Sequence, residues 1–142
     1  MLANARLWVA ALAKVIGSTD DLGRPVVRVE VPDRDGFLAV VATGFNRSLL
    51  LQAAEAQAMG FVITENSEIV ELGTTARVPV RRAYGRIQWL DRILQLEAFV
   101  SNEPPATSRP DMARALIGTE LLADCLLLVD FRSRIVEIED QR

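Results

Sequence analysis

The sequence predicts a mainly β fold with short helices and an N-terminal helical extension. Three observations support this fold class. From Arg24 onward the apolar residues mostly alternate with polar ones or form short β-branched runs, which is typical of strands. Glycine, proline and aspartate separate these runs, as expected of turns. The 142 residues, half of them hydrophobic, are enough for one globular domain with a core.

Residues 4–15 have a helical rather than an alternating pattern. Leu7, Ala11 and Val15 share one stripe at helical spacing, which predicts an amphipathic helix. We expect residues 1–23 to form a helical extension that packs on its own domain or on a partner copy. The apolar stretch is too short to span a bilayer, and acidic residues replace the cleavage site of a signal peptide. No membrane partner is therefore expected, and the predicted location is the cytoplasm.

The first predicted strands form a hairpin that leads into a short helix. A strand over residues 26–31 is followed by a proline- and glycine-containing turn over residues 32–36. A second strand over residues 37–42 is apolar on both faces and is therefore predicted to be internal. Residues 48–59 read as the end of a strand running into a short helix, which Gly60 stops.

The central part of the chain predicts a series of strands that cover residues 61–64, 67–72, 76–84, 86–89 and 93–101. Gly73, Thr74 and Thr75 are expected at a hairpin tip, and Gly85 at a bulge or bend. Residues 102–110 hold three prolines and predict a loop.

The last part of the chain predicts two strands after a short helix. Residues 113–118 precede a helix over residues 119–123, which the Thr119 hydroxyl is placed to cap. Strands over residues 126–131 and 134–139 then form the closing hairpin.

Composition excludes several function classes. The chain has no histidine, which removes Ser-His-Asp and Cys-His nucleophile systems and histidine-based metal sites. It has no glycine-rich phosphate loop, and its net charge of −3 disfavours a nucleic-acid partner. The single cysteine, Cys125, reads as a small buried hydrophobe, with a reactive thiol as the alternative. No metal or cofactor is expected.

Three separated segments resemble the retropepsin-like aspartic proteases, in particular their small bacterial members. Residues 38–46, Leu-Ala-Val-Val-Ala-Thr-Gly-Phe-Asn, are similar to the family's active-site strand and turn, which read apolar-apolar-Asp-Thr/Ser-Gly. Residues 115–118, Ala-Leu-Ile-Gly, resemble the strand that crosses behind this turn. Residues 126–139 are similar to the closing hairpin. Ala42 departs from the pattern, because it stands where the family has its catalytic aspartate.

The resemblance implies a closed, barrel-like acid-protease fold over residues 24–142. It also implies an endopeptidase that is active as a homodimer on an extended peptide, with an interface formed by residues 134–139 and N-terminal residues. The implied site residues fall into three groups. The catalytic turn holds Ala42, Thr43 and Gly44; the substrate-contacting residues are Phe45, Asn46, Gly73, Thr74 and Thr75; the structural support is Leu116, Ile117 and Gly118.

Ala42 leaves two explanations open. A methyl group cannot activate water, so the chain as written is expected to lack aspartic-protease activity. One explanation is an introduced substitution of the catalytic acid, which the intact Thr43 and Gly44 favour. The other is a natural pseudoprotease that binds peptides or only dimerises.

Overall fold

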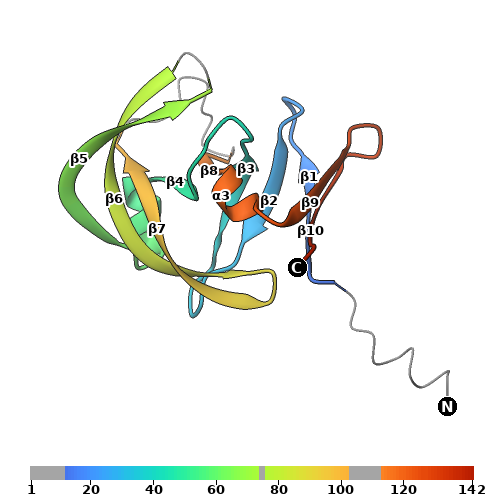
Figure 1. The fold of residues 1–142 in the computed structure, drawn as a ribbon, viewed down its shortest axis with the longest axis horizontal. Coiled ribbons are helices and arrows are strands. Elements are labelled where there is room, and N and C mark those ends of the chain that lie inside the picture. The colour runs from blue at the N-terminus through green and yellow to red at the C-terminus, as the bar shows by residue number, and fades with distance from the viewer. Residues whose placement is uncertain (1–11, 74–75, 103–112) are drawn as a thin grey trace.

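The computed structural model describes residues 12–73, 76–102 and 113–142, and the fold of these residues is mainly β. They form one mixed ten-stranded sheet with the order β5-β6-β7-β4-β8-β3-β2-β1-β10-β9 (Figure 1). The elements are β1 (Lys14–Thr19), β2 (Pro25–Val29), β3 (Phe37–Val41), β4 (Leu49–Gln52), α2 (Ala53–Ala58), β5 (Val62–Leu72), β6 (Ala76–Trp89), β7 (Arg92–Ser101), β8 (Ala115–Ile117), α3 (Thr119–Leu122), β9 (Cys125–Asp130) and β10 (Ile135–Asp140). The predicted mainly β class with short helices is confirmed. The predicted closed barrel is wrong, because β5 and β9 are unjoined edges.

The predicted N-terminal helix is wrong where the chain is described. Lys14–Thr19 is strand β1, which pairs with β10 and, at its end, with β2. Pairing with the neighbouring strands overrides the helical spacing of the apolar residues in this segment. Gly17 lies so close to β2 that no side chain fits there. A Cβ atom on Gly17 would lie 2.0 Å from the backbone oxygen of Val26. Residues 4–11 lie outside the described residues, and the boundary at residue 23 falls inside the β1–β2 hairpin.

The predicted hairpins and the first short helix are confirmed. β2 and β3 are antiparallel, with Val29 opposite Phe37, and helix α2 follows β4 directly. Gly60 has a φ of +79°, as its place after α2 requires. The two pairs of strands predicted between residues 61 and 89 are continuous strands, β5 and β6. Thr119 does not cap α3, because the N-cap residue is Gly118.

Gly85 makes space for an aromatic ring instead of forming a bulge. Its pairing with Leu96 is regular, and a Cβ atom there would lie 2.6 Å from the ring of Phe61. The irregular register lies in β5, between Ile63 and Ser67. The glycine at residue 85 is therefore explained by the close packing of Phe61 on the sheet.

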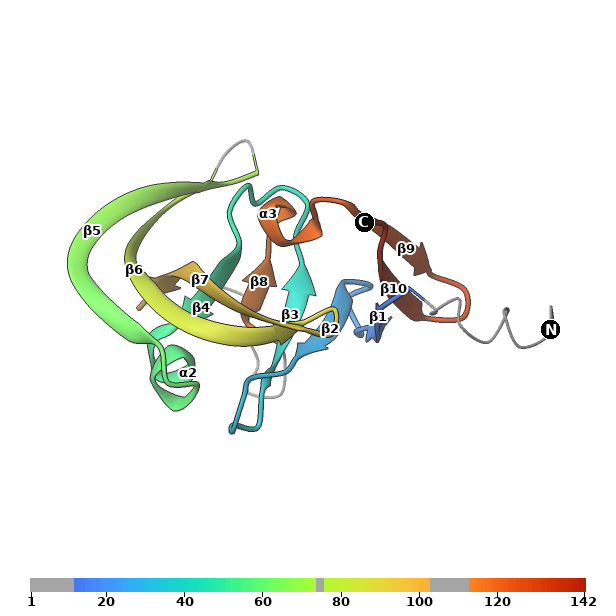
Figure 2. The ribbon, with the colours of Figure 1, turned by 60° about the horizontal axis from the view of Figure 1, so that its bottom comes forward.

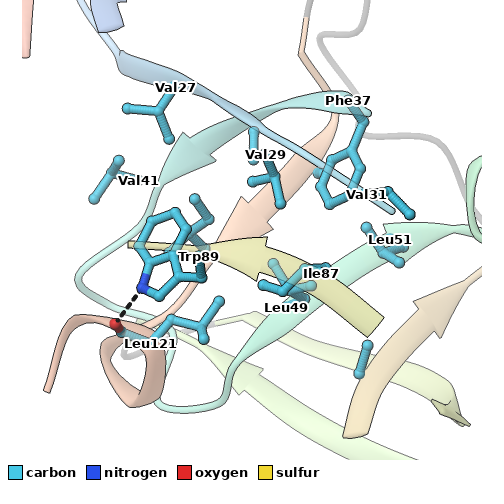
Figure 3. Packing of buried hydrophobic residues seen from close by; sticks show 14 of the residues in the cluster. Val27, Val29, Val31, Phe37, Val41, Leu49, Leu51, Ile87, Trp89 and Leu121 are labelled. Atoms are coloured by element: carbon cyan, nitrogen blue, oxygen red, sulfur yellow. Dashed lines mark hydrogen bonds between the residues drawn. The ribbon is translucent and has the colours of Figure 1, made fainter. Parts of the chain in front are cut away.

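The main hydrophobic core consists of side chains from several strands of the curved sheet, which gather around Trp89. The Trp89 side chain is buried, and its Nε1 donates a hydrogen bond to the Leu121 backbone oxygen at 3.2 Å (Figure 3). Buried side chains from β2, β3, β4 and β6 surround it: Val27, Val29, Phe37, Val41, Leu49, Leu51 and Ile87. This core fixes α3 against the sheet and so positions the elements around the β3–β4 turn.

Glu55 in α2 is a half-buried acid outside the predicted site. Its carboxylate accepts the backbone N–H of Gln52, as in a capping box, while the buried Oε1 atom has no hydrogen-bond partner among the residues that the structure describes. Burial raises the pKa of Glu55 above its ordinary value. The native state therefore holds this proton more tightly than the unfolded state does.

We expect the free energy of unfolding to fall as the pH rises from the ordinary pKa of glutamate through the raised pKa of Glu55. Glu55→Gln keeps an acceptor for the Gln52 N–H and removes the titration, so the variant should be the more stable form at pH 7, by about 1 kcal/mol or less. Urea unfolding of both forms between pH 4 and pH 8 measures this. Equal pH dependence in the two forms would contradict it.

Candidate functional site

The candidate site is the turn that joins β3 to β4. The Ala42 backbone N–H donates to the Ile117 oxygen at 2.8 Å, and the Phe45 N–H donates to the Ala42 oxygen at 3.1 Å. These two bonds fix both ends of the turn. Thr43, Gly44 and Asn46 are exposed at its surface, and Ala42 is half-buried.

Strand β8 lies directly behind this turn, between β3 and β4. It runs parallel to β3, with Val40 opposite Leu116, and antiparallel to β4, with Leu50 opposite Leu116. The structure therefore brings Leu116 and Ile117 next to the turn from more than 60 positions away in the sequence, as the resemblance implies. Ile117 is fully buried and Leu116 half-buried, so both support the turn as packing residues.

Gly118 lets the turn approach β8 closely. A Cβ atom on Gly118 would lie 2.0 Å from the Arg47 backbone oxygen and 2.6 Å from that of Phe45. The Gly118 N–H donates to the Ser48 oxygen at 2.8 Å, and the Thr119 N–H donates to the Phe45 oxygen at 2.8 Å. The loop from Phe45 to Ser48 is thus held against Gly118 by its backbone, and there is no space for a side chain.

The end of the β5–β6 hairpin lies over the same turn (Figure 1, Figure 2). The Gly73 N–H donates to the Gly44 oxygen at 2.9 Å, and Phe45 and Leu72 form an isolated antiparallel bridge. Gly73 has a φ of +65°, consistent with its place at the start of the hairpin's turn. Thr74 and Thr75, the other residues expected at the tip, lie outside the described residues.

Phe45 lies in the core instead of the surface of the site. It is 0% exposed and packs in a second cluster, which consists of Phe45, Leu50, Val70, Val80 and Phe99. Four half-buried side chains pack against this cluster: Ala42, Leu72, Val78 and Leu116. In this conformation Phe45 has no surface with which to contact a substrate. Its aromatic side chain next to a strand end was the only sequence signal for burial.

A charged group next to the second cluster was missed by the sequence interpretation. Arg82 forms ion pairs with Glu68 and with Glu97, the latter at 3.1 Å, and Arg82 and Arg47 both lie over the Phe99 ring. The hydrogen bond from Arg82 holds the pKa of Glu68 below its ordinary value. These residues are far apart in the sequence, so only the pairing of β5, β6 and β7 reveals the cluster.

Two acids close to residue 42 in the sequence, Asp33 and Asp35, do not replace the missing carboxylate. Asp33 and Asp35 lie in the turn before β3, whereas Ala42 follows the opposite end of that strand. The five residues of β3 span about 16 Å, which separates both acids from Ala42. Within the described ranges, no group of three or more histidine, cysteine, aspartate or glutamate side chains could hold a metal ion. Cys125 is half-buried, and this burial raises the pKa of its thiol.

The strand expected at a dimer interface is not free to pair with another chain. Both edges of β10 are occupied, one by β1 and the other by β9. Over residues 12–73, 76–102 and 113–142, β9 is the strand with a free edge at this end of the sheet, and it exposes Leu126 and Leu128. Among the described residues, no helix is long and apolar enough to cross a membrane.

Comparison of this chain with family models, with curated proteins and with solved structures finds no match. The candidate site is therefore described by its own geometry. It is a turn at the end of a β strand, with a parallel strand behind it and a hairpin over it.

Proposed function

We propose that this chain is one subunit of a homodimeric endopeptidase of the retropepsin-like aspartic protease type, in a form that lacks the catalytic acid. The observation that supports it best is the position of the Ala42-Thr43-Gly44 turn. It emerges from β3, is backed by β8 and Gly118, and lies under the β5–β6 hairpin. Extended peptides bind exposed sheet edges through main-chain hydrogen bonds, and β5 of this hairpin is an edge strand.

An aspartate at residue 42 would support catalysis only together with a second aspartate from another copy of the chain. Two carboxylates that share one proton can act as base and acid on one water molecule, and one chain of this type carries one such turn. The proposed enzyme is therefore a dimer with C2 symmetry. The alternative is a non-catalytic pseudoprotease that binds peptides or only dimerises. The packing of the Ala42 side chain against the second cluster favours this alternative, because an apolar methyl suits that environment.

We propose that β9 forms the dimer interface. Its four central residues, Leu126 to Val129, are all apolar, and the strand has an open edge without lysine or proline to protect it. Antiparallel pairing of two copies of β9 around a twofold axis would cover that edge. It would also bring the exposed leucines of the two copies onto the same face.

We expect the unmodified chain to have twice the mass of one 15.7 kDa chain in light scattering. Leu126→Lys, which adds a charge to the free edge of β9, should give a monomer that no longer binds an extended apolar peptide. Ile69→Lys is the matched control, because Ile69 is 60% exposed and lies on β5, the other free edge. A monomeric unmodified chain, or equal masses for the two variants, would refute this interface.

A further inference from the structure

A cavity of about 550 Å³ lies beside α2, at the end of β3 that is remote from the β3–β4 turn. Figure 2 shows α2 and the start of β3 at one end of the sheet and the turn at the other end. The walls come from three parts of the chain: the start of β3, the end of β4 with α2, and the residues just before β8. Small-molecule sites usually have volumes of about 300–1,000 Å³, so this cavity has the size of a ligand site.

Contacts within the folded chain hold the walls of this cavity in place. The Arg34 side chain donates a hydrogen bond to the Ala58 backbone oxygen at 3.0 Å, which ties the end of α2 to the turn before β3. Ala115 lies opposite Ala39 in the parallel pairing of β8 with β3, and this register brings Arg114 next to the start of β3. The cavity is therefore formed by the fold before any ligand enters.

Most of the cavity lining is apolar. Phe37 is buried at the start of β3, and the neighbouring Leu38 leaves 45% of its surface exposed. Met59, which follows α2, is half-buried and contributes a flexible apolar side chain to another wall. Ala54 and Ala58 of α2 also line the cavity, and their small side chains leave it open. The lining suits an apolar group of a ligand.

Two half-buried side chains of opposite charge line the same cavity, Glu55 from α2 and Arg114 from the segment before β8. The positive charge of Arg114 acts to lower the pKa of Glu55, against the larger effect of burial, and no hydrogen bond between the two contributes. The buried Oε1 atom of Glu55 has no partner among the described residues. The terminal torsion of a glutamate side chain is soft, so a small rotation turns this oxygen toward a donor in the cavity.

We propose that this cavity binds an apolar α-amino acid as its zwitterion, with the ammonium group on Glu55, the carboxylate on Arg114 and the side chain against Leu38. A ligand with a single charge would leave one of the two protein charges without a partner, whereas a zwitterion pairs both. The planar guanidinium of Arg114 also matches a carboxylate in geometry. Because the length of β3, about 16 Å, separates this cavity from Ala42, the inference does not depend on the proposed peptidase activity.

The test is an NMR titration of the unmodified chain with L-phenylalanine and two analogues that each lack one charge. 3-Phenylpropanoate lacks the ammonium group, and 2-phenylethylamine lacks the carboxylate. L-Phenylalanine should shift the backbone amides of α2 and of Arg114, and each analogue should bind at least about tenfold more weakly, because it loses one charge-assisted hydrogen bond. No shift in α2 up to the solubility limit of phenylalanine, or equal affinity for the three compounds, would overturn the proposal.

Matched variants then assign each charge to its partner. Glu55→Gln keeps the shape of the side chain without its charge, and should weaken phenylalanine about tenfold while leaving 3-phenylpropanoate unchanged. Arg114→Met should weaken 3-phenylpropanoate and leave 2-phenylethylamine unchanged. Glu120→Gln is the control, because Glu120 is the acidic residue in the first turn of the other short helix, α3, and is exposed. Equal affinities for phenylalanine in Glu55→Gln and Glu120→Gln would refute the role of Glu55 and with it the zwitterion site.

Discussion

Gly118→Ala is expected to lower the free energy of unfolding by about 3 kcal/mol, at the upper end of the cost of overpacking. The added methyl would lie 2.0 Å from the Arg47 oxygen and 2.6 Å from the Phe45 oxygen. Both are backbone atoms, which cannot move aside as the end of a flexible side chain can. The φ of Gly118 is −99°, which any residue adopts, so the cost is steric.

The consequence should reach the candidate site, because the same loop carries it. Moving the backbone at Phe45 would break the Thr119-to-Phe45 hydrogen bond and separate the turn from β8. Urea unfolding measures the stability, and hydrogen exchange of the Thr119 amide measures the local effect. Gly23→Ala is the control, since Gly23 has a φ of +76° and an open surrounding. It should cost about 1 kcal/mol from backbone strain alone. Equal losses in the two variants would contradict the steric argument.

Much of the fold could be predicted from local patterns. β2, β3 and the turn between them follow from a β-branched run and a proline-glycine turn, and Gly60 marks the end of α2. The position of β8 behind the turn followed only from the resemblance. Strand pairing across more than 60 residues leaves no local signal in a single sequence.

The rest could not be predicted, because tertiary contacts determine it. β1 has apolar residues at helical spacing, but β10 and β2 provide the pairing that makes it a strand. The alternation in β10 does not reveal that both of its edges are filled, so the sequence did not show that this strand is already paired on both sides within the chain. The burial of Phe45 likewise depends on Val70 and Val80, which arrive from the hairpin.

Ala42→Asp is expected to produce peptide cleavage, which the chain with Ala42 is expected to lack. Residue 42 is fixed by its backbone bonds to Ile117 and Phe45, so the new carboxylate would start from a defined backbone position. In the proposed dimer, two such carboxylates share one proton, since like charges in close contact cannot both ionise easily. Cleavage should therefore occur at acid pH and decline as the second proton leaves. General acid and base catalysis by the pair predicts a rate about 10³-fold above that of Ala42→Asn.

The Ala42→Asn variant is the matched control, because it has the shape of aspartate without its charge. Mass spectrometry of a mixed peptide library at acid and neutral pH identifies any cleaved bonds. Cleavage by the aspartate form alone, blocked by a statine-type transition-state mimic and abolished by Leu126→Lys, would establish a dimeric aspartic protease. If neither form cleaves while the dimer is intact, the missing acid at residue 42 is not the only reason that the site is inactive. The non-catalytic peptide-binding role then becomes the better explanation. The contact between the β5–β6 hairpin and the turn, and the apolar second cluster, both form without a carboxylate at residue 42.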